Sequence, residues 1–344
     1  MTIKRFILLL LIVLGLVYLY FWYVRGINLL LSEDDALSQQ PYYSFAVRLP
    51  AKGGTMPAHW EVAKPLPAEL SDVAAAAIGN SVYVAGGLDA FGHTVNALFV
   101  FDAVNNSWSQ ALPLPQPLYG VALVSYDGKI YAIGGFTGLT GKAVDSLYIY
   151  QPSDNTWAKG RSLPRALGSV SAVVLDGKIH VFGGYSEGRS SDKQYVYDLQ
   201  SNEWRDDEPL ITGRDHAAAT VVGGVFYLFG GQQGSFINAL ADIMRYDPVA
   251  KFWEQLDPMK ERRASFSALE RDGKIYLFCG QTASGTVGRV DIFDPKTRAW
   301  SSAPDMSVPR QGCGVTEAAG RIFVIGGGRK PGFSVSNVNE VFVP

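Results

Sequence analysis

Six copies of a glycine doublet and six tryptophans alternate along most of this chain of 344 residues. The doublets lie 47 to 49 residues apart, and the tryptophans recur with the same steps. Each tryptophan precedes the next doublet by 26 residues, so variation in length is confined to the other half of the unit. The doublets are Gly86-Gly87, Gly134-Gly135, Gly183-Gly184, Gly230-Gly231, Cys279-Gly280 and Gly326-Gly327, and the tryptophans are Trp60, Trp108, Trp157, Trp204, Trp253 and Trp300. The chain is therefore an array of repeated units of roughly 50 residues.

Each unit is predicted to form four short strands, named a to d in chain order. In the third unit, residues 168–175 are small and β-branched, which suits a strand buried on both sides. Asp176-Gly177 predicts a tight turn, and residues 179–182 form a second strand that ends at the doublet. Strand c ends with an aromatic residue and then Asp or Gln, six residues before the tryptophan of strand d: Asp102, Gln151, Asp198, Asp247 and Asp294. The pattern predicts an all-β chain of antiparallel sheets.

This combination of glycine doublet, aromatic-Asp pair and tryptophan resembles the kelch repeat. The resemblance covers residues 60–344 and implies a six-bladed β-propeller, in which each unit forms one blade around a central channel. The last unit ends at Pro344 with strand c, whereas His59-Trp60 belong to a strand d that has no strand a, b or c before it. We expect the strand around Trp60 to complete the last blade, which leaves no unpaired inner edge. The propeller domain is thus predicted over residues 59–344.

The first 25 residues differ from the rest of the chain. Phe6 to Val24 contains no charged residue and would be about 28 Å long as a helix, enough to cross a bilayer. Lys4 and Arg5 precede this run, which favours a cytoplasmic N-terminus and a propeller outside the cytoplasm, periplasmic or extracellular. We predict a single-pass transmembrane signal-anchor at residues 1–25 and a stalk at 26–58. The alternative is a cleaved signal peptide, which is disfavoured because no small-x-small cleavage site follows the long apolar run.

The remaining composition is that of a soluble β protein. The formal net charge is −2, the isoelectric point is near 6.1 and no polybasic run occurs, which argues against a nucleic-acid partner. The two cysteines are Cys279, in the fifth doublet, and Cys313, near the start of strand a of the sixth unit. Neighbouring sheets pack about 10 Å apart, farther than a disulfide spans. We therefore expect two buried free thiols, with a disulfide as the alternative.

The loops from strand d to strand a and from strand b to strand c are predicted to share one rim of the propeller. This follows from the antiparallel order, because strand a leaves one face and strand b returns to it. These loops vary between units while the scaffold does not, so we expect a ligand or partner site at this rim, around the channel mouth. Candidate ligand-binding residues in these loops are Asp72, Tyr119, Arg165, Tyr185, Asp215, His216, Gln232 and Gln281.

Arg214, Arg263 and Arg310 complete the candidate set. They lie ten residues after the repeat tryptophan in three consecutive units, and Arg165 lies two positions earlier in the third unit. A partial ring of guanidinium groups suits a carboxylate, an acidic sugar or an acidic peptide, because arginine binds oxyanions through a planar fork. The alternative is structural, since arginine is common at this step in kelch repeats and often pairs with a neighbouring blade.

Binding is the expected function, in preference to catalysis. We expect a membrane-anchored propeller that presents its loop rim to a protein or to an acidic glycan or peptide. The alternative is a sugar mutarotase or epimerase, similar to the periplasmic kelch mutarotases of N-acetylneuraminate, with Asp72, Asp215 or Glu261 as the acid/base group and an arginine as the clamp. Short loops leave little to close over a substrate, which favours the binding role. No metal or cofactor is expected, because His93 and His216 are isolated on the rim.

Overall fold

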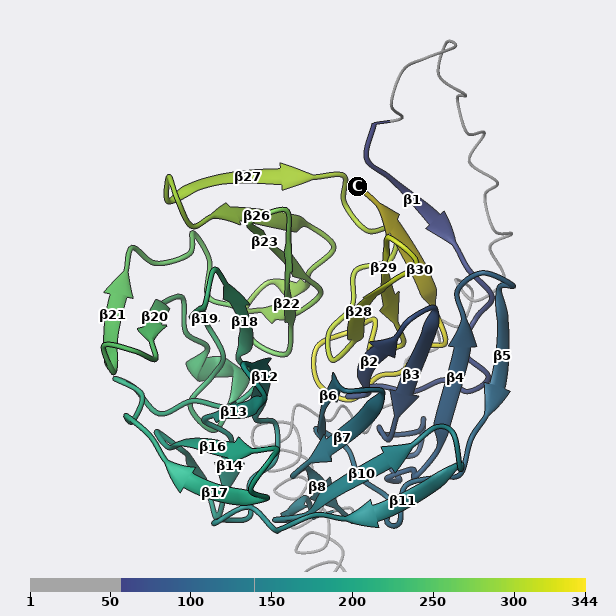
Figure 1. The fold of residues 1–344 in the computed structure, drawn as a ribbon. Helices are drawn as coiled ribbons and strands as arrows, with labels where there is room; N and C mark the ends of the chain where they lie inside the picture. Colours follow the sequence, from purple (N-terminus) through teal and green to yellow (C-terminus); the bar gives the residue numbers. More distant parts are fainter. Residues whose placement is uncertain (1–56, 139) are drawn as a thin grey trace, which may run out of the picture.

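The computed structural model describes residues 57–138 and 140–344, which form a ring of six four-stranded antiparallel sheets (Figure 1). The first three blades are β2 (Ala74–Ile78), β3 (Ser81–Ala85), β4 (Leu98–Asp102) and β5 (Ser107–Gln110); β6 (Ala122–Tyr126), β7 (Lys129–Ile133), β10 (Leu147–Gln151) and β11 (Thr156–Lys159); and β12 (Ser171–Leu175), β13 (Lys178–Phe182), β16 (Gln194–Asp198) and β17 (Glu203–Asp206). The next two are β18 (Ala218–Val222), β19 (Val225–Phe229), β20 (Ile243–Asp247) and β21 (Phe252–Leu256); and β22 (Ser267–Arg271), β23 (Lys274–Phe278), β26 (Val290–Asp294) and β27 (Ala299–Ala303). The sixth is β28 (Gly314–Ala318), β29 (Arg321–Ile325), β30 (Asn339–Val343) and β1 (His59–Val62).

The prediction of an all-β, six-bladed propeller is confirmed. Strand a of each blade lies against strand a of the next blade around the channel, and strand d is outermost. Three small ribbons extend from the b-to-c connections: β8 (Phe136–Thr137) with β9 (Lys142–Ala143), β14 (Tyr185–Ser186) with β15 (Arg189–Ser190), and β24 (Gln281–Thr282) with β25 (Gly285–Thr286). In the fourth blade this connection contains the 3-10 turn η2 (Phe236–Asn238).

The predicted signal-anchor at residues 1–25 lies outside the described residues, as does all but the end of the predicted stalk at 26–58. Within residues 57–138 and 140–344, no helix is long and apolar enough to cross a membrane. The anchor therefore stays a prediction from the sequence.

The N-terminal strand is the outer strand of the sixth blade. β1 pairs antiparallel with β30, and Trp60 lies opposite Phe342 with ring centroids 5.2 Å apart. Trp60 also packs edge-on against Phe278 of the fifth blade, at 6.1 Å. The first and last described strands of the chain thus form one sheet, which closes the ring of blades (Figure 1).

The repeat tryptophan and the aromatic residue of strand c are cross-strand neighbours. In the first blade Trp108 lies opposite Phe101, with ring centroids 4.9 Å apart. Trp108 Nε1 donates a hydrogen bond to the backbone oxygen of Lys64, which ties this outer strand to the segment that leaves the closing strand. Asp102 Oδ1 accepts from two backbone N–H groups of the c-to-d turn. The aromatic-Asp pair of strand c and the tryptophan of strand d, the two most regular features of the sequence, therefore form the outer half of each blade.

The glycine doublets lie where neighbouring blades touch. Gly86 has a φ of 66°, and a Cβ at this position would lie 2.3 Å from the backbone oxygen of Leu118 in the next blade. Gly87 N donates to the same oxygen at 2.8 Å. A side chain at Gly86 would clash with this oxygen, so the contact and the left-handed φ favour glycine here.

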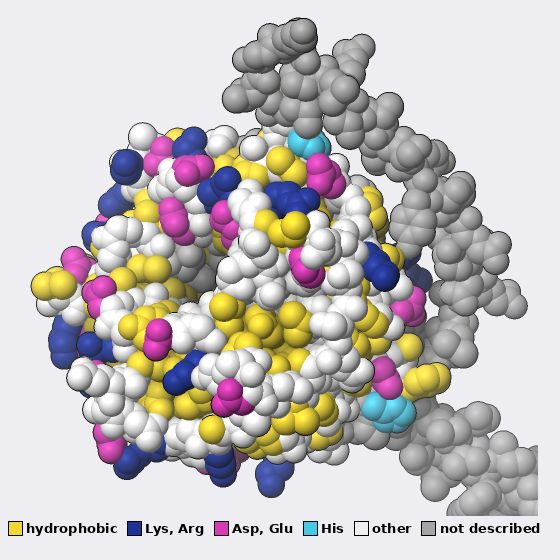
Figure 2. Space-filling view, turned by 45° about the vertical axis from the view of Figure 1, so that its right-hand side comes forward, with side chains coloured by type: hydrophobic (Ala, Val, Ile, Leu, Met, Phe, Trp, Pro, Cys, Tyr) yellow, Lys and Arg dark blue, Asp and Glu magenta, His cyan; other side chains and the backbone are white. Residues whose placement is uncertain are grey.

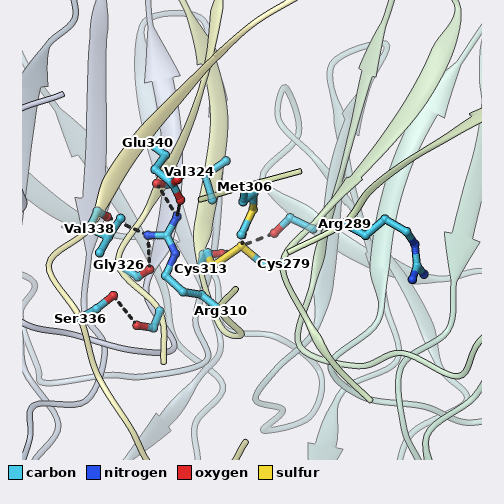
Figure 3. Close-up of a disulfide and its surroundings, with 12 residues drawn as sticks. Cys279, Arg289, Met306, Arg310, Cys313, Val324, Gly326, Ser336, Val338 and Glu340 are labelled. Atoms are coloured by element: carbon cyan, nitrogen blue, oxygen red, sulfur yellow. Dashed lines mark hydrogen bonds and ion pairs between the residues drawn. A yellow bond between two sulfur atoms is a disulfide. The ribbon is translucent and has the colours of Figure 1, made fainter. Parts of the chain in front are cut away.

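The expectation of two free thiols is wrong, because Cys279 and Cys313 form a disulfide (Figure 3). Cys279 replaces the first glycine of the fifth doublet, so it occupies the point of closest approach between two blades. The Cα atoms are 6.5 Å apart, well below the spacing of about 10 Å between packed sheet faces. The disulfide covalently links the fifth blade to the sixth.

Candidate functional site

The d-to-a and b-to-c loops meet at one rim, where each blade forms a short antiparallel bridge between them. In the fourth blade Asp215 and Gln232 exchange backbone hydrogen bonds of 3.0 and 2.8 Å. Together these loops surround a cavity of about 660 Å³ at the mouth of the channel, lined from all six blades. Seven predicted site residues line it: Asp72, Tyr119, Tyr185, Asp215, His216, Gln232 and Gln281.

At the floor of this cavity lies a ring of six residues, one from each blade, which we call the channel ring. Three of its members line the cavity itself: Asp72, His216 and Ser265. Each lies twelve residues after a repeat tryptophan and has a φ between 50° and 62°. Five of the N–H groups donate to the carbonyl of the preceding ring member, at 2.7 to 3.2 Å. The members are Asp72, Gly120, Ser169, His216, Ser265 and Gly312. The ring also lines a narrower space of about 210 Å³ inside the channel.

His216 is held between a carboxylate and a hydroxyl. Its Nδ1 lies 2.5 Å from Asp215 Oδ1, and its Nε2 lies 3.0 Å from Ser169 Oγ. Asp215 is itself buried, and its Oδ2 accepts from Ser190 Oγ at 2.5 Å and from Gly234 N at 3.2 Å. Four loops, two from the third blade and two from the fourth, therefore fix the orientation of one imidazole.

The electrostatics of the floor follow from these contacts. Burial alone lowers the pKa of His216, but the hydrogen bond and charge of Asp215 and the charge of Asp72 raise that pKa above its usual value. Burial raises the pKa of Asp215, but its bonds to His216, Ser190 and Gly234 hold the pKa below the usual range. Burial raises the pKa of Asp72, which lies across the ring from His216. Acid and base groups are thus present at the floor.

Ser169, His216 and Asp215 are linked in the same order as the triad of serine hydrolases. Such an enzyme also needs N–H donors directed at the oxyanion of the tetrahedral intermediate. Here the N–H groups of Ser169 and of its ring neighbours Gly120 and His216 are bonded to carbonyls of adjacent blades. The triad-like chain therefore positions His216, while these three N–H groups are already bonded within the channel ring.

An aromatic row forms one wall of the mouth. The rings of Tyr119 and Phe136 lie 5.2 Å apart, and those of Phe136 and Tyr185 lie 6.3 Å apart. Phe136 is packed over Gly168, where a Cβ would clash with its ring. The row spans the second and third blades beside the acidic and imidazole groups of the floor.

The structure places the three regularly spaced arginines inside the blades. The side chains of Arg214, Arg263 and Arg310 are 1%, 2% and 0% exposed. Arg310 donates to the backbone oxygens of Gly326 and Val338 and pairs with Glu340 at 2.7 Å (Figure 3).

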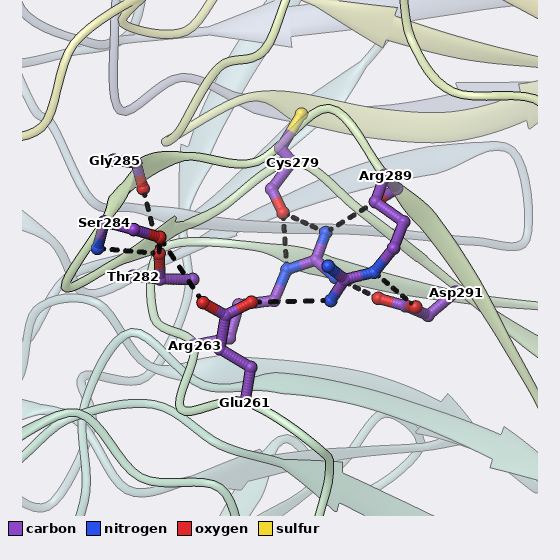
Figure 4. Close-up of polar contacts among 8 residues, drawn as sticks. All are labelled: Glu261, Arg263, Cys279, Thr282, Ser284, Gly285, Arg289 and Asp291. Atoms are coloured by element: carbon purple, nitrogen blue, oxygen red, sulfur yellow. Dashed lines mark hydrogen bonds and ion pairs between the residues drawn. The ribbon is translucent and has the colours of Figure 1, made fainter.

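The other two arginines make the same kind of contacts. Arg263 donates to Cys279 O and pairs with Asp291 at 2.9 Å (Figure 4), and Arg214 pairs with Asp242 at 2.5 Å. Burial lowers the pKa of Arg263 to about 10. Arg263 therefore remains charged at neutral pH, and each of the three arginines pairs with a carboxylate.

Each arginine has its carboxylate in its own blade, on or just before strand c, and not on a neighbouring blade as the structural alternative predicts. The guanidinium groups bridge the start of strand a, the first doublet residue and strand c, so they are occupied by the scaffold. Arg165, by contrast, stays on the rim, half exposed and 3.4 Å from Glu187. Figure 2 shows basic and acidic side chains interspersed on one face, without a large patch of either sign.

The profile of the KLHDC2/KLHL20/DRC7 Kelch-repeats domain family matches residues 72–269, more than half of the chain, and a Kelch motif matches residues 262–307. The chain belongs to this kelch family. Kelch propellers are typically protein-interaction modules. Among the described residues of this kelch propeller, no group of three or more His, Cys, Asp or Glu side chains is placed to hold a metal ion.

Curated relatives match over short segments. An F-box/kelch-repeat protein of Arabidopsis thaliana is 29% identical over 105 residues, 30% of this chain and 27% of that protein. Kelch-like protein 33 of Homo sapiens is 29% identical over 93 residues, 27% of this chain and 17% of that protein. Beta-scruin of Limulus polyphemus is 31% identical over 120 residues, 32% of this chain and 13% of that protein. The matched segment thus spans between 13% and 27% of the length of these relatives.

A solved structure, that of YjhT, superposes with a TM-score of 0.71 over 81% of this kelch chain and 96% of the other. The two sequences are 16% identical, so the likeness is one of fold.

Sequence reasoning missed three serines of the kelch mouth. Ser169 and Ser265 belong to the channel ring, and Ser190 bonds Asp215 from the ribbon of the third blade. The repeat register carried a signal for the two ring serines, because they align with Asp72 and His216 twelve residues after the tryptophan. Ser190 lies in a loop of variable length, so no register could place it.

Proposed function

We propose that this propeller is a binding module that takes a segment of a partner protein into the mouth of its channel. The observation that carries the proposal is the cavity of about 660 Å³, which all six blades line with aromatic, amide and titratable side chains. This volume lies within the range of ligand-binding pockets, about 300–1,000 Å³. The chain's membership of a kelch family supports a protein as the partner.

A peptide-display selection tests this role. The bait is the full-length chain, compared with a variant in which Tyr119 and Tyr185 are both replaced by Ser. The control replaces Tyr126, which lies exposed at the end of strand a far from the mouth, by Ser. Peptides that bind the wild type and the control but not the double variant are the expected result. Enrichment that is unaffected by the mouth substitutions would contradict the proposal.

We propose further that an N-terminal anchor holds the propeller outside the cytoplasm. The apolar run from Phe6 to Val24 and the preceding Lys4 and Arg5 support this location. The Cys279–Cys313 disulfide supports it independently, because disulfides persist mainly in oxidising compartments.

A sugar mutarotase or epimerase, as for N-acetylneuraminate, is a second candidate. The specific observation in its favour is the pair formed by Asp72 and His216, which face each other across the channel ring with raised pKa values. Ring opening of a sugar needs a general acid and a general base within reach of the same substrate. The arginine clamp expected for a carboxylate is absent from the described cavity lining.

Exchange between the anomers of N-acetylneuraminate, measured by NMR, decides this second candidate. The mutarotase role predicts faster exchange with the wild type than in buffer, and loss of that acceleration in His216→Gln. Exchange at the buffer rate would exclude the mutarotase role and leave the binding proposal intact.

A further inference from the structure

The mouth presents more acidic than basic groups to a ligand. Arg214, Arg263 and Arg310 lie within the blades, and Arg165 lies on the rim, 3.4 Å from Glu187. The charged side chains that line the cavity are Asp72, Glu187, Asp215, Lys142 and His216. The hydrogen bond between Asp215 and His216 places opposite charges side by side when the imidazole is protonated. Asp72 is the one carboxylate of the channel ring and interacts with the same imidazole, so two carboxylates and one imidazole meet at the floor. The floor of the cavity favours positive charge.

A buried acceptor in the same cavity lacks a donor. Gln232 is 7% exposed, and its Oε1 accepts no hydrogen bond within the described part of the chain. The side chain lines the mouth next to Asp215, with which its backbone is paired. Buried polar atoms in native proteins are nearly always satisfied, so an unsatisfied buried oxygen on a side chain that lines a binding cavity calls for a donor from the ligand.

The aromatic row suits the same ligand. Tyr119, Phe136 and Tyr185 stand beside this floor, and the negative face of an aromatic ring attracts a cation within about 6 Å of its centre. The methylene groups of a lysine or arginine side chain can pack on such rings while the head group reaches the acceptors.

We propose that the mouth selects a cationic hydrogen-bond donor: the ammonium or guanidinium group of a basic side chain, or a free amino terminus, in the partner's segment. Asp72 supplies the charge, Gln232 Oε1 supplies an acceptor and the aromatic row supplies the wall. This inference rests on the proposed binding function and names its ligand class. It replaces the acidic ligand expected from the arginine spacing.

Three capped tripeptides test the inference against the full-length chain. They are acetyl-Gly-Lys-Gly-amide, its glutamate counterpart and its norleucine counterpart, and their dissociation constants are measured by NMR titration. The lysine peptide should bind most tightly. Asp72→Asn should weaken the lysine peptide about fivefold to tenfold and leave the norleucine peptide unchanged. Asparagine tolerates the φ of 50° at this position, so the fold should persist.

Asp127→Asn is the matched control. Asp127 has a φ of 48° and lies exposed in the a-to-b turn, at the opposite end of strand a from the mouth. The Asp127→Asn variant should bind all three peptides with the same dissociation constants as the wild type. The inference is overturned if the glutamate or norleucine peptide binds as tightly as the lysine peptide, or if Asp72→Asn changes nothing. Display-selected peptides that need Tyr119 and Tyr185 but carry no basic group would overturn this inference alone, whereas failure of mouth-dependent selection would overturn the binding function as well.

Discussion

His180 occupies a position of strand b that is aromatic in every other blade. Tyr83, Tyr131, Tyr227, Tyr276 and Phe323 hold the equivalent place three residues before the doublet. His180 is 4% exposed, and its ring centroid lies 4.4 Å from that of Phe226. Burial lowers its pKa to about 4, against a partial opposing effect of Asp207. The imidazole therefore fills an aromatic position in its neutral form, as the repeat alignment predicts.

This burial makes stability depend on pH. The folded-state pKa of about 4 lies below the ordinary value of 6.5, so the unfolded chain binds the proton more readily between these values. The contribution is complete above pH 6.5 and is lost as the pH falls toward 4, by up to about 3 kcal/mol. His180→Phe should flatten this part of the profile in urea unfolding at several pH values. His93→Gln, at an exposed histidine, should not; equal profiles for wild type and His180→Phe would refute the assignment.

The buried arginines predict large losses of stability. Arg310→Ala leaves the carboxylate of Glu340, 2% exposed, without its cation. Breaking such a pair costs about 3–5 kcal/mol, because an uncompensated charge remains buried. Replacing both residues by Leu removes that charge and should restore much of the free energy of unfolding. A loss of stability in Arg310→Ala that does not depend on a ligand, and that the double variant reverses, identifies a structural ion pair. An unchanged melting temperature of Arg310→Ala would contradict this role.

Among the strands, β1 is the one that closes the ring of blades, and its removal would expose the edge of β30. A fragment of residues 64–344 lacks this strand and should aggregate or unfold, whereas a fragment of residues 57–344 should fold. Circular dichroism melts and size-exclusion chromatography compare the two. A circular permutant that joins residues 57–63 after Pro344 serves as the control, since strand d then follows strand c as in every other blade. Equal melting of the two fragments would show that β1 is dispensable.

The tight turns between strands could be predicted from the sequence, whereas the two-stranded ribbons of the b-to-c connections could not. Asp176-Gly177 forms the turn between β12 and β13, as the local turn chemistry predicts. The polar stretch that begins at Tyr185, by contrast, has no strand pattern in the sequence, yet it contains the ribbon β14–β15. Two-residue strands carry too little periodicity to be recognised, and their pairing depends on how the rim loops pack.

On the scale of the whole molecule, the proposed location gives a test in cells. If residues 1–25 anchor the chain with a cytoplasmic N-terminus, protease added outside intact cells or spheroplasts should cut within residues 26–58 and release a propeller fragment. The released fragment should carry the Cys279–Cys313 disulfide and resist thiol alkylation until it is reduced. A propeller that is protected until the membrane is permeabilised, or that is alkylated without reduction, would overturn the proposed orientation.

The sequence by itself determined the number of blades, the strand order and the loops that form the rim. These features depend on local spacing, because each repeat contains its own turns, its own doublet and its own pair of strand-c aromatic residue and tryptophan, like Phe101 and Trp108. Only the tertiary structure decided which rim residues face the cavity. A position ten residues after the tryptophan points into the blade, where Arg310 meets Glu340, while the position two residues later lies on the channel, where His216 meets Ser169 and Asp215. Spacing along one chain cannot reveal this, since Glu340 comes from strand c and Ser169 comes from another blade. The disulfide was decided in the same way, by how closely two blades approach at a doublet.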